Sequence, residues 1–403
     1  MLIYIFRIFV RIIVIAKLMM EFFDKIYLAY GWQGIALISV IVVLFIVQMY
    51  YYSIRYRRLP KYTNNSLPER LAVEPPVSVV IVTQEDADFI EERLPIYLTQ
   101  DYEEYEVVLV YVGNNEDFSI MLTQMQLRYP RLKITNIKQN TRFPISNKQA
   151  LNFGIRAAAY DHILLSTSDT IITSERWVRL MAKGFTRGDV VLGYCGVELR
   201  SGFVGRLMRT QRMAESMAWL SAAIRRKPYR GVRNTLGITR NLYLDVKGFN
   251  HLNMNMGEDD LFIQSLADKA TVSVIISPRA TVRQKVWGGA SWWLGARKYF
   301  GHTYRFYPLA ARNAIEWEGG SRLLFFLATT AALVALPLEL KLATAFIILL
   351  RYVLVYATVN SVRKRLGERN VMATYFLYDL FGVWVNIALA ASRRIYKDET
   401  VWR

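Results

Sequence analysis

The middle of the chain alternates between short apolar runs and segments with helical spacing, and this alternation limits the possible folds most strongly. The run Val77–Thr83 is continuous and apolar, which is typical of a parallel strand buried on both faces. Similar apolar runs follow at 106–112, 133–137 and 162–166. Segments with helical spacing lie between them, at 87–99, 118–129 and 147–160. Because short links join these segments, the sequence predicts an α/β domain with a doubly wound, mostly parallel sheet.

Polar residues follow three of these strands, in the segments 83–86, 113–117 and 166–169. Ligands of such sheets bind beyond the carboxyl ends of the strands, so these segments form one predicted rim. Polar loops follow most strands, and the clustering alone does not identify a site. The sequence has no Gly-x-Gly-x-x-Gly after the first strand and no Walker Gly-Lys-Ser/Thr, which disfavours ordinary dinucleotide or P-loop ATP binding. The remaining option is a sheet that holds a nucleotide through carboxylates and a divalent cation.

Long apolar segments flank this middle region. Residues 32–52 form a nearly unbroken apolar run of the ~20 residues that a spanning helix requires. The basic residues that follow place that end in the cytoplasm by the positive-inside rule: Arg55, Arg57, Arg58 and Lys61. The preceding segment 2–23 is apolar but contains arginine and lysine. It is an interfacial amphipathic helix, a weak second span or a mis-assigned start, and these three interpretations stay open.

The C-terminal part contains two predicted spans, 323–338 and 342–359, and Arg351 in the second must snorkel or face protein. A third segment, 371–391, either spans the membrane or lies in its interface, because a full crossing would carry the basic residues after it outside. The predicted parts are an N-terminal segment and anchor (1–60), a linker (61–76), a soluble domain (77–310) and a C-terminal membrane region (311–403). We expect a multi-pass protein of the cell (inner) membrane with a cytoplasmic soluble domain.

Composition supports a membrane protein and excludes some other classes. The hydrophobic fraction is 53% and the formal net charge is +18. Such a basic excess suits contact with anionic membrane lipids and with a di- or triphosphate substrate. Nucleic-acid binding is not expected, because no helix-turn-helix, zinc-finger or RNA-binding signature occurs. Cys195 is the only cysteine, so the chain has neither a disulfide framework nor a thiolate metal site.

Three consecutive carboxylates, Glu258, Asp259 and Asp260, stand between Gly257 and Leu261. Their mutual repulsion raises a pKa or demands a cation or an acceptor proton nearby. A general base or a metal-linked transferase site has these needs. The other interpretation is a solvated helix N-terminus, where acidic residues suit the helix dipole.

Several short motifs, each weak alone, follow one another in an order that resembles family 2 inverting glycosyltransferases with the GT-A fold. The bacterial membrane-anchored members of that family look most similar. The resemblance covers about residues 76–310. The matching segments are 76–82 (the opening strand), 106–113 (the second strand with its turn), 148–152 (the Lys-x-x-Ala-Leu-Asn helix), 166–169 (the Asp-x-Asp place), 248–249 (a Gly-Phe pair), 257–261 (the acidic acceptor motif) and 284–287 (the Gln-x-x-Arg-Trp place).

The resemblance implies an inverting transfer of a sugar from a nucleotide-sugar donor to a lipid-linked or membrane-proximal glycan acceptor. Asp259 is the implied catalytic base and Asp260 is the second choice. Glu258 would bind the acceptor or orient the base. Asp169 would hold Mg²⁺ or Mn²⁺ at the diphosphate.

Further implied contacts concern the donor and the acceptor. The residues assigned to the nucleotide-sugar are Thr83, Glu85, Asp86, Gly113, Lys148, Thr167 and Asp169. Gln284 and Trp287 would contact the pyrophosphate and the acceptor sugar. Lys148 stays open between a phosphate contact and an ordinary surface lysine. Trp292 and Trp293 stay open between sugar stacking and the bilayer interface.

The sequence departs from the family pattern at three places. Tyr111, Val112 and Gly113 stand where the second strand normally ends in an aspartate. Thr167 replaces the first aspartate of Asp-x-Asp, and the arginine of Gln-x-x-Arg-Trp is missing. We therefore expect weaker metal and nucleotide binding than in a standard member, and no processive polymer synthesis.

The leading prediction is a membrane-anchored glycosyltransferase of envelope or exopolysaccharide synthesis, with membrane lipids and other polysaccharide-synthesis proteins as partners. The alternative, which the motif losses motivate, is a catalytically degenerate relative that serves as a scaffold subunit. A transporter or channel subunit is disfavoured, because it would leave a soluble α/β domain of this size unexplained.

Overall fold

The computed structural model describes residues 31–62, 73–140, 144–249 and 257–395, together with the single positions 21, 71 and 142. The predicted segment 2–23 lies outside the described residues except for position 21, and the linker 61–76 lies partly outside them. The chain forms two compact units. One combines the residues up to Ile54 with Glu316–Ala357, and the other combines Arg55–Ile315 with the residues from Thr358 onward.

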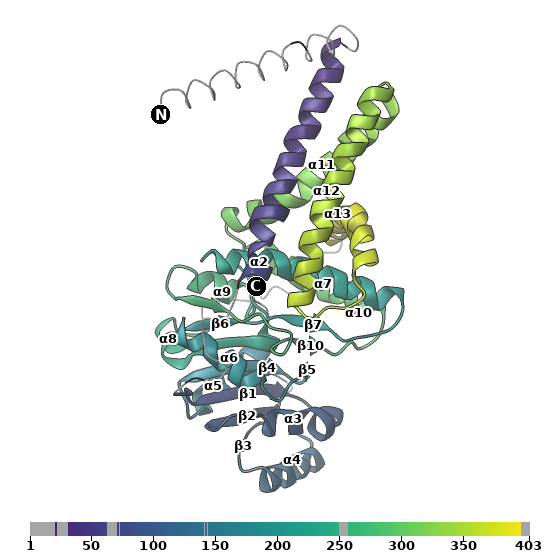
Figure 1. Ribbon diagram of the computed structural model, residues 1–403. Helices are drawn as coiled ribbons and strands as arrows, with labels where there is room; N and C mark the ends of the chain where they lie inside the picture. The colour runs from purple at the N-terminus through teal and green to yellow at the C-terminus, as the bar shows by residue number, and fades with distance from the viewer. Residues whose placement is uncertain are drawn as a thin grey trace, which may run out of the picture. The chain divides into compact units, whose positions relative to one another are not determined.

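A seven-stranded sheet forms the centre of the second unit, with the strand order β3-β2-β1-β4-β8-β6-β9 (Figure 1). Its strands in that order are Leu132–Ile137, Tyr105–Val112, Val77–Thr83, His162–Thr167, Leu236–Thr239, Val190–Leu192 and Val272–Val274. The first four strands are parallel, β8 is antiparallel to both of its neighbours, and β9 is parallel to β6. This mostly parallel sheet confirms the predicted α/β class.

The parallel strands are buried because their side chains are apolar on both faces. All eight residues of β2 are buried, as are all but one of the residues of β1. Helix α5 (Asn147–Ala157) packs on β1 and β2, and Gly154 of this helix allows the close approach. A Cβ atom at that position would lie 2.5 Å from a methyl carbon of Val80. The residues at the carboxyl ends of these strands are therefore held on a rigid layer.

Two N-caps fix the helices next to the rim. Ser146 and Gln149 form a capping box that starts α5. The Asn115 side chain accepts a hydrogen bond from the Phe118 backbone N–H and starts α4 (Glu116–Arg128). These caps place both helix N-termini at the carboxyl ends of β1 and β2.

A second, three-stranded sheet has the order β5-β10-β7, with the bounds Thr170–Ile172, Val282–Gln284 and Cys195–Val197. Strand β10 is antiparallel to β5 and parallel to β7, and its register sets Gln284 opposite Thr170. Because β5 begins three residues after β4 ends, this register brings Gln284 beside the carboxyl end of β4.

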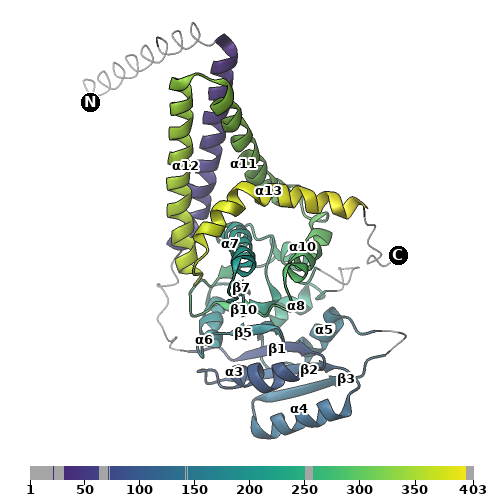
Figure 2. The ribbon, with the colours of Figure 1, turned by 90° about the vertical axis from the view of Figure 1, so that its right-hand side faces the viewer.

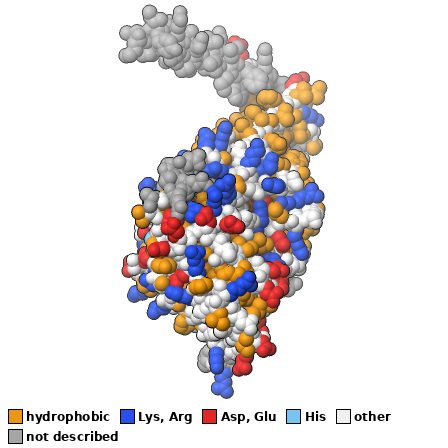
Figure 3. Space-filling view, turned by 60° about the horizontal axis from the view of Figure 1, so that its bottom comes forward, with side chains coloured by type: hydrophobic (Ala, Val, Ile, Leu, Met, Phe, Trp, Pro, Cys, Tyr) orange, Lys and Arg blue, Asp and Glu red, His pale blue; other side chains and the backbone are white. Residues whose placement is uncertain are grey.

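Helices cover the second sheet. Helix α13 (Met372–Ile395) packs along α7 (Phe203–Ile224), and it also touches α10 (Ala290–Tyr304), as Figure 2 shows. The other short helices of this unit are η2 (Phe89–Arg93), α3 (Leu94–Leu98), α6 (Trp177–Ala182), η3 (Lys183–Thr186), η4 (Arg233–Thr235), α8 (Arg240–Asp245) and α9 (Leu261–Leu266). Basic and acidic side chains are interspersed over the face seen in Figure 3.

Three helices among the described residues are long and apolar enough to span a membrane: Gly31–Lys61, Leu338–Arg365 and Met372–Ala391. The first ends in a π-helical stretch, η1 (Tyr50–Tyr56), and the short α2 (Arg58–Lys61). The second is α12 and the third lies in α13. The predicted spans 32–52 and 342–359 fall within the first two of these helices.

The predicted span 323–338 differs from the structure. Its residues 323–335 lie in α11 (Leu309–Ala335), which is not among the three helices named above, and its last residue, Leu338, begins α12. The apolar part of α11 begins after Arg322 and ends with the helix at Ala335, which is shorter than a span requires. The third predicted segment, 371–391, lies almost entirely in α13, which is apolar enough to cross a membrane and also packs on α7.

The first unit buries Arg351 against protein, as the sequence analysis allowed. Its Nη2 donates to Oε1 of Gln48 at 2.9 Å, and Nε2 of Gln48 donates to Oγ of Ser321 at 2.8 Å. The guanidinium also lies 5.4 Å from the ring centroid of Phe325 and 4.9 Å from that of Phe326. Polar and aromatic partners thus compensate a charge inside an apolar helix.

Candidate active site

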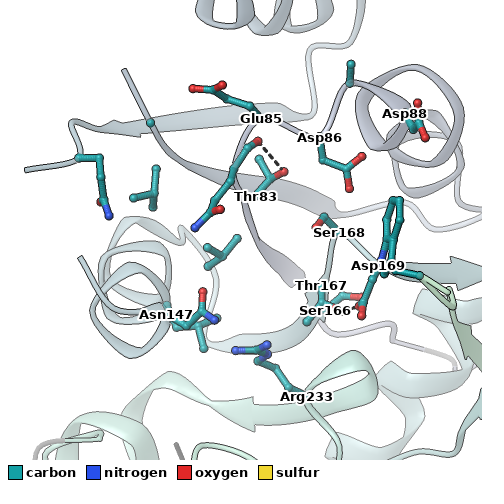
Figure 4. A pocket seen from close by; sticks show the side chains of 18 of the residues that line it. Thr83, Glu85, Asp86, Asp88, Asn147, Ser166, Thr167, Ser168, Asp169 and Arg233 are labelled. Atoms are coloured by element: carbon teal, nitrogen blue, oxygen red, sulfur yellow. Dashed lines mark hydrogen bonds between the residues drawn. The ribbon is translucent and has the colours of Figure 1, made fainter. Parts of the chain in front are cut away.

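An open pocket of about 1150 Å³ lies at the carboxyl ends of β1, β2 and β4 (Figure 4). Of the residues assigned from sequence, those that line it are Thr83, Glu85, Asp86, Gly113, Thr167, Asp169 and Trp287. The predicted rim therefore encloses one cavity. Arg233 also lines this pocket and was not predicted from the sequence.

Asp86 is fixed in place by its neighbours. Its Oδ1 accepts a hydrogen bond from the Phe89 backbone N–H at 2.9 Å, and its Oδ2 lies 3.1 Å from Nη2 of Arg93. Nε of Arg93 also donates to the Ser168 carbonyl oxygen at 3.1 Å. Asp86 thus ties the segment after β1 to the segment after β4. Glu85 is less constrained, with the Tyr111 hydroxyl 3.4 Å from its Oε1.

Gly113 lies against the ring of Tyr111. A Cβ atom at Gly113 would lie 2.4 Å from the Tyr111 hydroxyl oxygen. The tyrosine ring therefore occupies the space beside the end of β2, where the family pattern has a carboxylate. Val112 and Gly113 remain available to line the pocket.

Asp169 receives hydrogen bonds at both carboxylate oxygens. Its Oδ1 accepts from Nδ2 of Asn234 at 3.1 Å and from the Thr167 hydroxyl, while its Oδ2 accepts from Nε2 of Gln284 at 2.8 Å. Nη2 of Arg212 in turn donates to Oε1 of Gln284 at 2.9 Å. The carboxylate is thus oriented before any ligand arrives.

The residues around Asp169 fit a divalent cation that takes most of its ligands from substrate and water. Mg²⁺ sites of phosphate-binding enzymes use one or two carboxylates together with phosphate oxygens and waters. Asp169 supplies one carboxylate in the pocket wall, and Thr167 supplies no charge beside it. The described residues contain no group of three or more histidine, cysteine, aspartate or glutamate side chains that would hold a metal ion without a substrate.

The acidic trio divides into three different environments. Asp260 is the N-cap of α9: its Oδ1 accepts from the Leu261 backbone N–H at 2.7 Å. Its Oδ2 accepts from the Tyr307 hydroxyl at 2.7 Å and from the Thr303 hydroxyl. Asp260 therefore anchors α10 and the segment after it to α9.

Asp259 has the properties of a base that works near neutral pH. Burial raises the pKa of its carboxyl to about 7, Arg233 lowers it, and the charges of Glu258 and Asp260 raise it further. Its Oδ1 accepts a hydrogen bond from the Arg233 backbone N–H at 3.2 Å. A carboxylate with such a pKa both ionises near pH 7 and accepts a proton readily.

Helix η4 contacts both the acidic trio 258–260 and Asp169. Arg233 contacts the trio through its backbone N–H and through Nη1, which lies 2.8 Å from Oε1 of Glu258. The next residue, Asn234, donates to Asp169. One step along the chain therefore links the trio to the pocket wall, although Glu258, Asp259 and Asp260 are not among the residues that line the pocket.

Lys148 and Gln284 occupy positions that the sequence did not reveal. Lys148 is buried on α5 and is not among the residues that line the pocket. Burial lowers the pKa of Lys148, and the charge of Glu258 acts in the opposite direction. The charge of Lys148 therefore interacts with that of Glu258. Gln284, assigned from sequence to the pyrophosphate or acceptor, contacts Asp169.

The tryptophans after β10 differ in exposure. Trp287 lines the pocket and is 50% exposed. Nζ of Lys285 lies over its ring, 4.3 Å from the ring centroid. Trp292 and Trp293 pack against a cluster that contains Val197, and Nε1 of Trp293 donates to a side-chain oxygen of Gln211. These contacts leave Trp287 as the tryptophan of this segment that faces the cavity.

The family model described as Glycosyltransferase like family 2 matches residues 75–300, which is more than half of the chain. The chain therefore belongs to glycosyltransferase family 2, and the resemblance inferred from its motifs is confirmed. Membership in this family makes sugar transfer its class of reaction. A search of curated protein sequences found no match.

Solved structures share the GT-A fold. The mannosyltransferase PcManGT from Pyrobaculum calidifontis, solved with GDP-Man and Mn²⁺, has 18% identity and a TM-score of 0.51, with 83% of this chain and 99% of that chain covered. TarS residues 1–349 from S. aureus has 15% identity and a TM-score of 0.40, with 72% and 82% covered. The likeness to the mannosyltransferase confirms the predicted fold.

Proposed function

We propose that this protein transfers a sugar, with inversion, from a nucleoside-diphosphate sugar to a hydroxyl of a lipid-linked or membrane-proximal glycan acceptor. The observation that carries the proposal is the position of η4. Its Arg233 contacts Asp259 while its Asn234 contacts Asp169, which links the proposed base to the proposed cation-binding carboxylate. The residues 77–310 form the proposed transferase domain.

Asp259 acts as the general base in the proposed reaction. Its carboxylate takes the proton of the acceptor hydroxyl while the acceptor oxygen forms a bond to the anomeric carbon of the donor sugar. The bond from that carbon to the diphosphate oxygen breaks, and its electron pair leaves with the nucleoside diphosphate. A single displacement of this kind inverts the anomeric configuration.

Asp169 would hold Mg²⁺ or Mn²⁺, which supplies charge neutralisation for the leaving diphosphate when bound. Thr167, Asn234 and Gln284 orient its carboxylate for this contact. The Mn²⁺ of the mannosyltransferase structure supports this choice of ion. Glu258 holds Arg233 beside the base and is the proposed acceptor-side acid.

A membrane-bound acceptor agrees with the three helices that are apolar enough to span a membrane. Basic residues stand at the ends of two of these helices: Arg55 in the first, and Arg363, Lys364 and Arg365 after Val359 in the second. By the positive-inside rule, they support a cytoplasmic position of the transferase domain. Nucleotide-sugars are then used on that side. Envelope or exopolysaccharide synthesis is the proposed context.

A scaffold without catalysis is the second candidate. The single carboxylate at the metal position favours it, because Thr167 brings no charge. The test uses the purified full-length protein in nanodiscs with a panel of nucleotide-sugars, with and without Mn²⁺. Binding by calorimetry and sugar transfer or hydrolysis with at least one donor support the enzyme. Absence of binding for every donor in both conditions contradicts it and favours the scaffold.

A further inference from the structure

The pocket has an unbalanced charge. Its lining contains the carboxylates Glu85, Asp86, Asp88 and Asp169. Two of them already face a cation: Asp86 pairs with Arg93 at 3.1 Å and Asp88 pairs with Lys285 at 3.3 Å. A diphosphate bound near Asp169 would add further negative charge, and bound anions need compensating charge in a partly buried site.

Arg233 is the single lysine or arginine among the described residues that line this pocket. Its backbone N–H is fixed by the hydrogen bond to Asp259, so the base of the side chain has a defined place. The side chain is 22% exposed, and Figure 4 shows it extending below Thr167 toward Asn147. The guanidinium therefore reaches the cavity from the same side as Asp169.

We propose that Arg233 binds the diphosphate of the donor directly and stabilises the negative charge that develops on the leaving group. This inference rests on the proposed function. A guanidinium has five N–H donors in a planar fork, so Nη1 keeps its contact with Glu258 while other donors contact phosphate oxygens. No proton leaves Arg233: the electron pair of the broken bond goes to the diphosphate oxygen.

This role makes Arg233 a catalytic residue and supplies the positive charge that the Gln-x-x-Arg-Trp element lacks in this chain. Val286, one of the residues at that place, is buried against Val197 and Met208 and is not among the residues that line the pocket. Arg233 of η4 supplies the positive charge instead, and it stands next to Asn234, which orients Asp169.

The test measures binding of UDP and GDP, and of uridine and guanosine, to the full-length protein by calorimetry, with and without Mn²⁺. Arg233→Gln is expected to lower the affinity for the diphosphate about tenfold or more and to leave the affinity for the nucleoside unchanged. The diphosphate affinity of Arg233→Lys is expected to lie between those of wild type and Arg233→Gln, since lysine keeps the charge and loses the planar set of N–H donors.

Glu258→Gln is the matched control, because it breaks the same ion pair and keeps the cation. Its affinity for the diphosphate is expected to stay within about threefold of the wild-type value or to increase. Equal affinity of wild type and Arg233→Gln for the diphosphate would overturn the inference. An equal loss for nucleoside and diphosphate would also overturn it, since it indicates damage to the fold.

Two further outcomes separate this inference from the proposed function. If Arg233→Gln does not fold, as judged by its thermal unfolding, the comparison of Arg233→Lys with wild type decides: an unchanged diphosphate affinity then contradicts the inference. If the wild-type protein binds neither diphosphate in either condition, the proposed function itself fails. A failure of the Arg233 assignment alone leaves wild-type binding intact.

Discussion

The side-chain amide of Asn234 donates a hydrogen bond to Oδ1 of Asp169 at 3.1 Å, across 65 residues of sequence. The same amide lies 2.7 Å from the hydroxyl oxygens of Thr167 and Thr170. One asparagine therefore organises the carboxyl end of β4. Arg233 precedes it and contacts Asp259, so two consecutive residues contact the proposed cation ligand and the proposed base.

Asn234→Ala removes one of the donors that orient the Asp169 carboxylate. A hydrogen bond to a charged group contributes about 1.5–3 kcal/mol, so we expect the half-saturating Mn²⁺ concentration for transfer to rise about tenfold or more. The affinity for the nucleoside alone should stay unchanged. Asn241→Ala, at an exposed position on α8, is the control. An unaltered Mn²⁺ dependence in Asn234→Ala would show that Asp169 needs no orientation.

The rate of transfer should depend on the ionisation of Asp259. Because burial raises the pKa of this carboxyl to about 7, the base is protonated and inactive below that pH. We expect kcat to rise with pH and to level off above about 7.5. Arg233→Gln removes a charge that lowers this pKa, so the rising limb should move to higher pH. A profile that is flat from pH 5 to pH 8 would contradict the assignment.

The raised pKa of Asp259 also has a consequence for stability. The folded protein keeps the proton to a higher pH than the unfolded chain, whose carboxyl ionises near 3.8. This group therefore stabilises the fold least above pH 7, and its contribution decreases as the pH rises from about 4 to about 7. Asp259→Asn should gain thermal stability relative to wild type over that window. A difference in melting temperature that does not change with pH would argue against it.

Asp260 should matter for stability and not for proton transfer. Asp260→Ala removes the N-cap of α9 and leaves the buried hydroxyls of Thr303 and Tyr307 without their acceptor. We expect a loss of about 2 kcal/mol or more in the free energy of unfolding. Tyr307→Phe should cost less, because the carboxylate keeps its other donors. Denaturant unfolding of the three proteins in detergent measures the differences, and a fully stable Asp260→Ala would refute the anchoring role.

Glu368 holds strand β10 from the segment between α12 and α13. Its Oε1 lies 2.9 Å from Nη1 of Arg283 and accepts from the Tyr194 hydroxyl at 3.0 Å. Removing one partner of a buried ion pair costs about 3–5 kcal/mol, so Glu368→Ala should unfold at much lower temperature. The double variant Glu368→Gln with Arg283→Met should recover part of the loss. Equal melting temperatures for wild type and Glu368→Ala would contradict this.

The parallel half of the sheet could be predicted because its strands are apolar on both faces. The predicted run 77–83 matches β1, and the runs 106–112, 133–137 and 162–166 differ from β2, β3 and β4 by one residue. Helix boundaries were less accurate. The segment 87–99 divides into η2 and α3 at Leu94 and Pro95, since proline has no N–H to donate within a helix.

The rest of the domain could not be predicted from local patterns. Strands β5, β7 and β10 have three residues each, which is too short for a periodicity, and their places depend on pairing with distant strands. The rim of the pocket followed from the ends of the predicted strands. Arg233 and Asn234 were missed because their roles depend on contacts with residues that lie far away in the sequence.

The departures at Thr167 and at the end of β2 have structural counterparts. Thr167 donates to Asp169 and takes part in orienting it. The ring of Tyr111 lies beside Gly113 at the end of β2, and its hydroxyl faces Glu85. Their identity was visible in the sequence, but the compensating contacts were not, since these join side chains from different strands.

The most direct test of the account is sugar transfer by Asp259→Asn, measured beside its affinity for the nucleoside diphosphate. Asp268→Asn, an exposed position just after α9, is the matched control. The account predicts that Asp259→Asn loses transfer by at least about a hundredfold, keeps its nucleotide affinity and remains folded, while Asp268→Asn behaves as wild type. Transfer by Asp259→Asn at the wild-type rate would contradict the account.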